Sequence, residues 1–257
     1  MKRPSVLILR AAGTNCDLET GFAFEQCQAR VIFRHIWSLK PETLSKVQIL
    51  VLPGGFTYGD YLGAGRILAN ELKARFQDEI LKFIEDGKLI IGICNGFQVL
   101  IKTGLLPATD GYYKTEATLA DNDSGHFEDR WVHLRPEPNR SPFLAKIDRI
   151  FELPVAHAEG KFMAPTVVLD KMRKNGQIAI RYCGPDGNHA QYPYNPNGSA
   201  LDIAGITDPT GQIFGLMPHP ERFINPLHHP RHTREAVDFC AGLEILKRGV
   251  EYVRKNL

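Results

Sequence analysis

Residues 92–98 read Gly-Ile-Cys-Asn-Gly-Phe-Gln, and this stretch decides the fold. The run before it, residues 88–91, is apolar and rich in β-branched side chains, which is typical of a buried strand. After it, apolar residues recur at helical spacing as far as Gly104. We therefore expect Cys94 at the point where a strand turns into a helix, with a glycine two residues away on each side.

Such a turn is a nucleophile elbow, with sulfur in place of the serine oxygen. Small neighbours are needed there because a side chain would strike the strand or the helix. The helix N-terminus favours a thiolate, and the backbone N–H of Asn95 is free to receive an oxyanion. The alternative is that Cys94 is a small core residue, as most cysteines after apolar runs are. A base elsewhere in the chain must decide between the two interpretations.

The composition is that of an ordinary globular protein, with 43% hydrophobic and 23% charged residues. We expect one domain over residues 1–257. The net charge of +2 gives no reason to expect nucleic acid or an anionic membrane as a partner, and no segment reaches the length of a membrane span. The five cysteines lie far apart and form no C-x-x-C motif, so we expect reduced thiols in the cytoplasm: Cys16, Cys27, Cys94, Cys183 and Cys240.

The order of elements predicts an α/β fold. Apolar runs at residues 6–9, 29–36, 47–52 and 88–91 read as strands. One helix, ending at about Cys27, is expected between the first two strands, none between the second and third, and a long helix at residues 67–85 before the fourth. This order implies an open, mostly parallel sheet with helices on both faces. Between Gly104 and Arg149 the periodicity weakens, and we expect a β-rich excursion within the same domain. Further on, the patterns predict a hairpin of residues 203–207 and 213–217, and a last helix over residues 233–253.

The loop at residues 53–65 contains five glycines and follows the carboxyl end of a strand. Open α/β sheets place their ligands at such ends. Neither G-x-G-x-x-G nor Gly-Lys-Ser/Thr occurs, so no nucleotide fingerprint is met. We interpret the loop as backbone that approaches a small substrate closely, with the N–H of Gly55 serving the same oxyanion as that of Asn95. A plain surface turn is the alternative.

Residues 218–222, Pro-His-Pro-Glu-Arg, supply the missing base. The two prolines hold His219 in a stiff, extended backbone. Glu221 is two residues further on, so both side chains project from one side of the segment. A carboxylate beside an imidazole fixes its tautomer and stabilises the imidazolium. Cys94, His219 and Glu221 therefore form a predicted set of nucleophile, base and orienting acid.

Other histidines in the sequence could act as a base or bind a metal. His157 and Glu159 could act as a base and its orienting acid, or could belong to a polar turn that shapes the pocket. His228, His229 and His232 raise the question of a metal site. Adjacent and proline-spaced histidines do not share a helix face, so we expect a solvated loop and no metal there.

The combination of Gly-x-Cys-x-Gly with a distant His-Pro-Glu resembles the class I (triad) glutamine amidotransferases, whose fold is flavodoxin-like. The resemblance covers nearly the whole chain. Longer motifs, at residues 13–17, 53–62, 92–98, 195–199 and 215–222, resemble the glutaminase subunits of phosphoribosylformylglycinamidine synthases, which serve de novo purine biosynthesis.

The resemblance implies a mechanism. Cys94 would attack the side-chain amide carbon of L-glutamine, while His219, oriented by Glu221, would carry the proton to the departing ammonia. The N–H groups of Gly55 and Asn95 would stabilise the oxyanion. Contacts with the substrate are implied for Gln98 and Phe56.

The resemblance also implies partners. Ammonia would pass to a large synthetase subunit, accompanied by a small bridging subunit, where ATP and Mg²⁺ activate formylglycinamide ribonucleotide. No cofactor is expected in this chain.

Two alternative functions stay open at this point: a cysteine peptidase or hydrolase with the same triad, and a non-enzymatic redox-sensing relative with Cys94 as an oxidisable thiol. The chain also departs from the family. Ala158 stands where glycine is common and would be strained if its φ were positive. Residues 121–149 and 228–231 fit the family less well, and we assign them no chemistry. With His219 and Glu221 in place, His157 and Glu159 lose the role of base and orienter.

Overall fold

The computed structural model describes residues 3–257. Its first half alternates strands and helices, and it has one helix, α2 (Pro41–Lys46), that was not expected, between the second and third strands. The elements are β1 (Ser5–Arg10), α1 (Asp17–Gln26), β2 (Arg30–His35), α2, β3 (Ile49–Leu52), α3 (Arg66–Glu85), β4 (Leu89–Ile93) and α4 (Asn95–Thr103). The strands of this half are parallel and adjacent, in the order β2-β1-β3-β4.

The second half is mainly antiparallel. It comprises β5 (Thr118–Asp121), β6 (Glu128–Pro136), β7 (Phe151–His157), β8 (Glu159–Met163), α5 (Thr166–Asn175), β9 (Ile178–Cys183), β10 (Ile203–Thr207), β11 (Ile213–Leu216) and α6 (Ala241–Asn256). The predicted hairpin of β10 and β11 is present. Strand β11 pairs in parallel with β4, and the sheet continues as β11-β10-β9-β6-β7.

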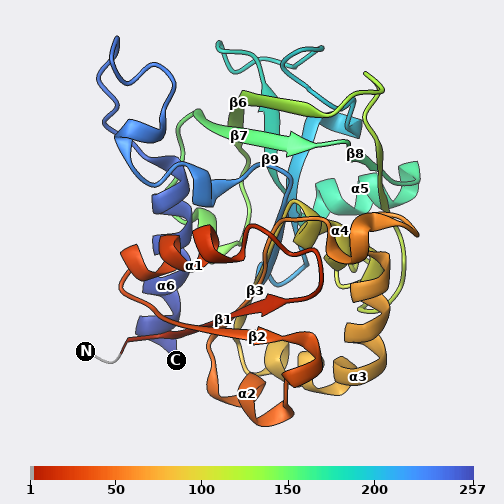
Figure 1. Cartoon of the computed structure of the whole chain (residues 1–257). Coiled ribbons are helices and arrows are strands. Elements are labelled where there is room, and N and C mark those ends of the chain that lie inside the picture. Colours follow the sequence, from red (N-terminus) through yellow and green to blue (C-terminus); the bar gives the residue numbers. More distant parts are fainter. Residues whose placement is uncertain (1–2) are drawn as a thin grey trace.

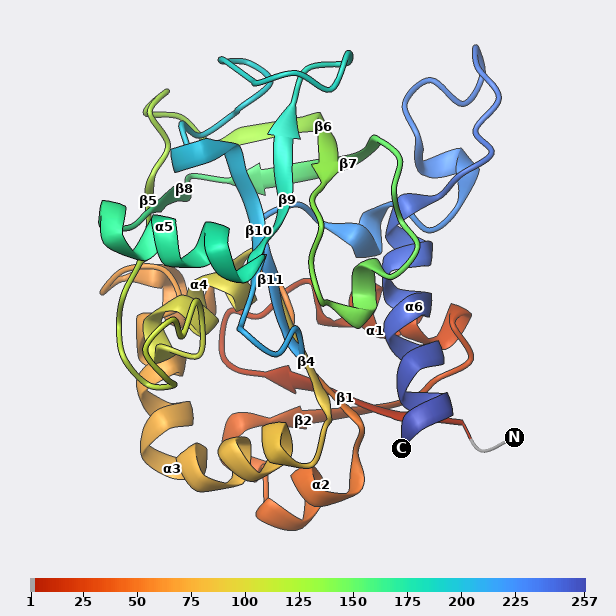
Figure 2. The ribbon, with the colours of Figure 1, turned by 180° about the vertical axis from the view of Figure 1, so that it is seen from behind.

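The β-rich excursion is therefore divided between two sheets. Strands β6 and β7 extend the nine-stranded main sheet, whereas β5 pairs with β8 in a separate two-stranded sheet. Figures 1 and 2 show α1 and α6 together on one side of the parallel half, and α3 and α4 together on the other. Helices on both faces explain why the parallel strands are apolar along their whole length: all four residues of β3 are at most 2% exposed.

Two expectations about the C-terminal part are wrong. The last helix begins at Ala241, not at residue 233. A Cβ on Gly242 would lie 1.8 Å from the carbonyl oxygen of Pro220. The backbone at Gly242 therefore packs directly against that of Pro220, and the helix begins beside this contact. His229 is also not solvated, since it is 5% exposed and packs edge-on against Trp131, with ring centroids 4.9 Å apart. His228 and His232 are exposed, as expected.

Within the part of the chain that the structure describes, none of the helices combines the length and the apolar character that crossing a membrane requires.

Candidate active site

Cys94 lies at the turn between β4 and α4, with backbone φ of +51° and ψ of −106°. A positive φ is strained for a residue with a side chain and persists only where the surroundings enforce it. The backbone around Cys94 is packed tightly against its neighbours. A Cβ on Gly96 would lie 1.8 Å from the carbonyl oxygen of Leu52, and one on Gly92 would lie 2.6 Å from the carbonyl oxygen of Gly96. Both flanking residues must therefore be glycine for the turn to form.

The sheet brings His219 to the same edge as Cys94. Strand β11 lies beside β4, and the N–H of Cys94 donates to the carbonyl of Leu216 at 2.8 Å. The chain leaves β11 through residues 217 and 218, so His219 follows directly beyond the neighbouring strand end. Its backbone N–H donates to Pro154 of β7 at 2.8 Å. His219 is thus held between the end of β11 and strand β7, which lies about 60 residues earlier in the chain.

The Glu221 carboxylate contacts the imidazole of His219 at Nδ1. Its Oε1 lies 2.6 Å from His219 Nδ1, and the two residues are 2% and 1% exposed. Burial opposes protonation of the ring, but the Glu221 carboxylate, with the sulfur of Cys94, outweighs it and holds the pKa of His219 well above its ordinary value. An imidazolium beside a sulfur favours the nucleophilic thiolate.

The other ring nitrogen of His219 is available to the thiol. Within residues 3–257, Nε2 has no hydrogen-bond partner of acceptable geometry. Cys94 nevertheless lies close enough to raise the pKa of the ring. The Cys94 Sγ itself is 3.7 Å from the carbonyl oxygen of Ala156. The three side chains that the sequence predicts as a triad therefore converge at one end of the sheet.

A second thiol, which sequence reasoning missed, lies against the same ring. Cys16 Sγ, a ring nitrogen of His219 and a carboxylate oxygen of Glu221 are all within 4.8 Å of one another. Arg222 Nη2 donates to this sulfur at 3.3 Å. Burial raises the pKa of Cys16 despite the neighbouring His219, so Cys16 stays a neutral thiol. Its only sequence signal is its place in the motif at residues 13–17.

The two predicted oxyanion donors lie beside the nucleophile. Gly55 lines the same cavity as Cys94 and has a φ of +145°. A Cβ there would lie 2.8 Å from the backbone nitrogen of Asn15, so only glycine fits. Across the described chain, the N–H groups of Gly55 and Asn95 donate to no protein acceptor. Both N–H groups are therefore free to bind a developing negative charge.

A cavity of about 40 Å³ opens beside Cys94. Phe56 and Gln98, the predicted substrate contacts, both line it. Gln98 Nε2 donates to the carbonyl of Glu159 at 2.6 Å, and its Oε1 accepts from Asn95 Nδ2 at 2.9 Å. Both polar ends of Gln98 are thus used within the protein, and its contact with a substrate stays a prediction.

Two carboxylates, Asp60 and Glu159, also line the cavity. Asp60 Oδ1 accepts from Asn95 Nδ2 at 3.2 Å, and Glu159 Oε2 accepts from the N–H of Ala64 at 3.3 Å. Neither carboxylate forms a salt bridge within residues 3–257, as the ion pairs of that range show. Burial chiefly, and Glu159 in addition, raises the pKa of Asp60. The cavity therefore presents two carboxylates without a salt-bridge partner in the described residues. Burial chiefly lowers the pKa of Lys102, and Glu159 lies near enough to oppose this shift.

The segment around His157 differs from what was expected. It contains no polar turn of several residues, because β7 ends at His157 and β8 begins at Glu159. Ala158, between them, does not have a positive φ, so the strain considered for it does not arise. Both His157 and Glu159 line the cavity, although neither contacts the other as base and orienter.

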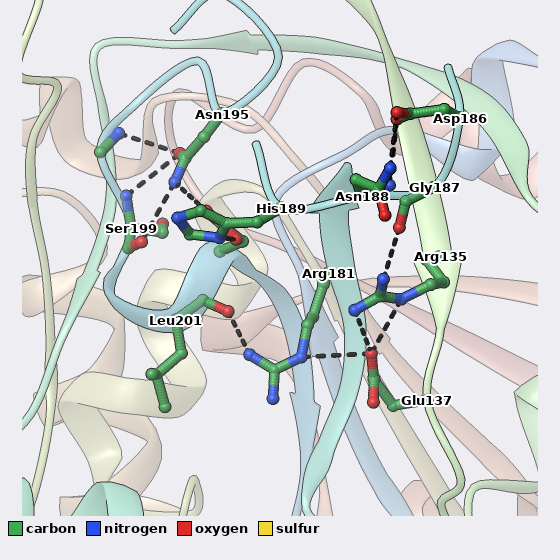
Figure 3. Close-up of polar contacts among 12 residues, drawn as sticks. Arg135, Glu137, Arg181, Asp186, Gly187, Asn188, His189, Asn195, Ser199 and Leu201 are labelled. Atoms are coloured by element: carbon green, nitrogen blue, oxygen red, sulfur yellow. Dashed lines mark hydrogen bonds and ion pairs between the residues drawn. The ribbon is translucent and has the colours of Figure 1, made fainter. Parts of the chain in front are cut away.

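The loop at residues 195–199 supports this cavity wall. Asn195 Oδ1 accepts from the N–H of Ser199 at 3.2 Å, which closes the loop on itself (Figure 3). Asn197 Nδ2 donates to the carbonyl of Gly160 in β8 at 2.9 Å. The loop thereby fixes the strand that carries Glu159, which gives this sequence motif a structural reason.

Comparison with known proteins agrees with this site. Residues 3–253 match the family described as the CobB/CobQ-like glutamine amidotransferase domain. The phosphoribosylformylglycinamidine synthase subunit PurQ of Dehalococcoides mccartyi is 46% identical over 99% of this chain and 100% of its own length. The subunit of the same name from Methanococcus maripaludis is 39% identical over 98% of each chain.

Solved structures give the same result. A chain in the structure of PurLQS from Thermotoga maritima has a TM-score of 0.76 and 30% identity, over 98% of this chain and 99% of its own. A glutamine amidotransferase from Thermotoga maritima, at 16% identity and a TM-score of 0.59 over 98% and 100% of the two chains, shares the fold. The chain therefore belongs to the CobB/CobQ-like glutamine amidotransferases and, among them, to the PurQ subunits of phosphoribosylformylglycinamidine synthase.

Proposed function

We propose that this chain hydrolyses L-glutamine to glutamate and ammonia and supplies the ammonia to a synthetase subunit, which converts formylglycinamide ribonucleotide to formylglycinamidine ribonucleotide. The observation that carries the proposal is the constellation at the sheet edge. A cysteine on a strained strand-to-helix turn lies beside an imidazole whose far nitrogen is 2.6 Å from a buried carboxylate. Nucleophile, base and orienting acid in this arrangement perform acyl transfer in unrelated folds.

Each step of the reaction has a residue in place. The Cys94 thiolate attacks the amide carbon of glutamine, and the carbonyl oxygen gains the negative charge that the N–H groups of Gly55 and Asn95 receive. His219 then gives its proton to the nitrogen, the carbon–nitrogen bond breaks, and ammonia leaves a glutamyl thioester on Cys94. Water, deprotonated by His219, hydrolyses the thioester to glutamate and restores the thiol. Removing one oxyanion donor costs about 3 to 4 kcal/mol of transition-state stabilisation in comparable sites.

The charge of the cavity suits this substrate. L-Glutamine carries an ammonium group, and the carboxylates of Asp60 and Glu159 form no salt bridge in the described chain. The cavity, at about 40 Å³, has room for about one to three water molecules and not for an amino acid. We therefore propose that the wall formed by Gln98 and Glu159 moves outward when glutamine binds.

The partners follow from the relatives. We propose that the chain works in a complex with a large synthetase subunit and a small bridging subunit, and that ATP and Mg²⁺ are bound by the synthetase partner and not here. We place this complex in the cytoplasm. The five cysteines are all free thiols in the structure, which suits a reducing compartment.

The test is Cys94→Ala in the reconstituted enzyme, with Cys240→Ala, a half-buried cysteine just before α6, as a matched control. Glutamine-dependent formation of the amidine product should disappear, while formation from ammonium salts should persist. The control should keep both activities. Loss of both activities in Cys94→Ala, or loss of neither, contradicts the proposal.

No observation favours the alternatives. The relatives of 46% and 30% identity that cover the chain are subunits of phosphoribosylformylglycinamidine synthase and not peptidases. A redox-sensing thiol has no use for a buried carboxylate behind the neighbouring histidine.

A further inference from the structure

One buried histidine in the cavity has no role in the mechanism above. His157 is 3% exposed and ends strand β7. Its Nδ1 lies 3.1 Å from Asn122 Oδ1. The amide nitrogen of Asn122 donates to two carbonyls, those of His126 at 3.0 Å and His157 itself at 2.8 Å, so the amide oxygen must be the acceptor. This oxygen also accepts from the N–H of Gly160 at 3.2 Å. The proton of the ring therefore sits on Nδ1.

The other nitrogen, Nε2, then carries no proton, and its lone pair can accept a hydrogen bond. Burial, and next the positive charge of His219, lower the pKa of His157 to about 3, so the ring is neutral in the physiological range. Nε2 is buried and has no hydrogen-bond donor anywhere in residues 3–257. A buried acceptor without a partner is costly to a fold. A ligand with an N–H group can supply the missing donor.

The position of the ring indicates which ligand that is. His157 lines the cavity next to Cys94 and is close enough to His219 for the two rings to influence each other's charge. The ring cannot turn freely, because a Cβ on Gly160 would lie 2.5 Å from its Nδ1 and Cε1 atoms. With Nδ1 held by Asn122, Nε2 is the ring nitrogen left without a protein partner in the described residues. A molecule attacked by Cys94 would occupy the cavity that His157 lines.

We propose that Nε2 of His157 accepts a hydrogen bond from the carboxamide nitrogen of the substrate, and then from the departing ammonia. This inference rests on the glutaminase function proposed above. A carboxamide nitrogen has two N–H groups, and its lone pair must face His219 when the carbon–nitrogen bond breaks. By accepting one N–H, His157 orients that lone pair toward the imidazolium. The proton passes from His219 to nitrogen, the electron pair of the broken bond stays on nitrogen, and His157 neither gains nor loses a proton.

Two substrates separate this role from a structural one. L-Glutamine presents N–H groups to His157, whereas the γ-methyl ester of L-glutamate reacts at the same carbon and presents none. The variants are His157→Phe, which keeps a ring and removes the acceptor, and His157→Gln, which restores an acceptor oxygen. The reconstituted complex is assayed for kcat/KM on both compounds.

We expect His157→Phe to lower kcat/KM for glutamine by about tenfold to hundredfold and for the ester by less than about threefold. His157→Gln should recover most of the loss on glutamine. Equal losses on both substrates would show that the ring only supports the fold, and an unchanged glutamine activity would show that it makes no such bond. Both outcomes overturn the inference while leaving the glutaminase function intact. A native enzyme that is inactive on glutamine overturns the proposed function as well.

Discussion

Replacing His157 with glutamine should make the free energy of unfolding depend less steeply on pH below about 6.5. The folded pKa of His157 is about 3, against an ordinary value of 6.5. Between these values the unfolded chain binds a proton that the folded protein excludes. The stability that the neutral ring confers is therefore fully present above 6.5 and is lost as the pH falls toward 3. At about pH 5 the loss has reached about 2 kcal/mol, since each pH unit below 6.5 costs about 1.4 kcal/mol.

The assay is urea unfolding at about pH 7.5 and about pH 5, followed by tryptophan fluorescence. The free energy of unfolding of the native protein should fall between the two conditions by about 2 kcal/mol more than that of His157→Gln. Carboxylates that titrate in this range are common to both proteins and cancel in the comparison. Equal falls would mean that the ring is not buried in its neutral form, which refutes the reasoning.

Three further predictions concern the site. Asp60→Asn should raise KM for glutamine about tenfold, roughly the contribution of one charge-assisted hydrogen bond, with little change in kcat; an unchanged KM would mean that Asp60 does not meet the ammonium group. Glu221→Gln should lower kcat about 10³- to 10⁴-fold, as in other triads, while KM stays close to native; a smaller effect than about tenfold would remove Glu221 from the triad. Gly96→Ala should reduce the free energy of unfolding by about 3 kcal/mol, because the new methyl group meets the backbone of Leu52, and native-like stability would show that the turn can relax.

The parallel half of the fold and the triad could be predicted because their signals are local. A run of β-branched residues, a glycine on each side of Cys94 and a helical repeat after it lie within a short stretch of chain. His219 and Glu221 are two residues apart, so their pairing is a local contact. The extended backbone expected for both holds only at His219, because Pro220–Arg222 form a 3-10 turn, and it is across this turn that the Glu221 carboxylate reaches Nδ1. That β11 lies beside β4 could not be predicted from these local signals, although this adjacency brings His219 to the edge that carries Cys94.

The rest of the cavity could not be predicted, because its contacts join distant segments. His157 is held by Asn122, 35 residues away in sequence, and nothing near either residue indicates the pairing. Cys16 meets His219 across more than 200 positions. The sequence predicts β6 and β7 only as a β-rich excursion, because short alternating patterns do not indicate which edge of which sheet a strand will join. Because His219 already accounts for the base, no pattern in the sequence gives His157 a role of its own.

The most direct test of the account is to trap the acyl intermediate. The reconstituted enzyme is mixed with L-glutamine, quenched with acid during turnover, digested and examined by mass spectrometry. The account predicts a glutamyl group in thioester linkage on the peptide that contains Cys94, absent from the Cys94→Ala enzyme. Turnover of glutamine with the glutamyl group on another residue, or with no covalent intermediate under conditions that preserve a model thioester, would contradict it.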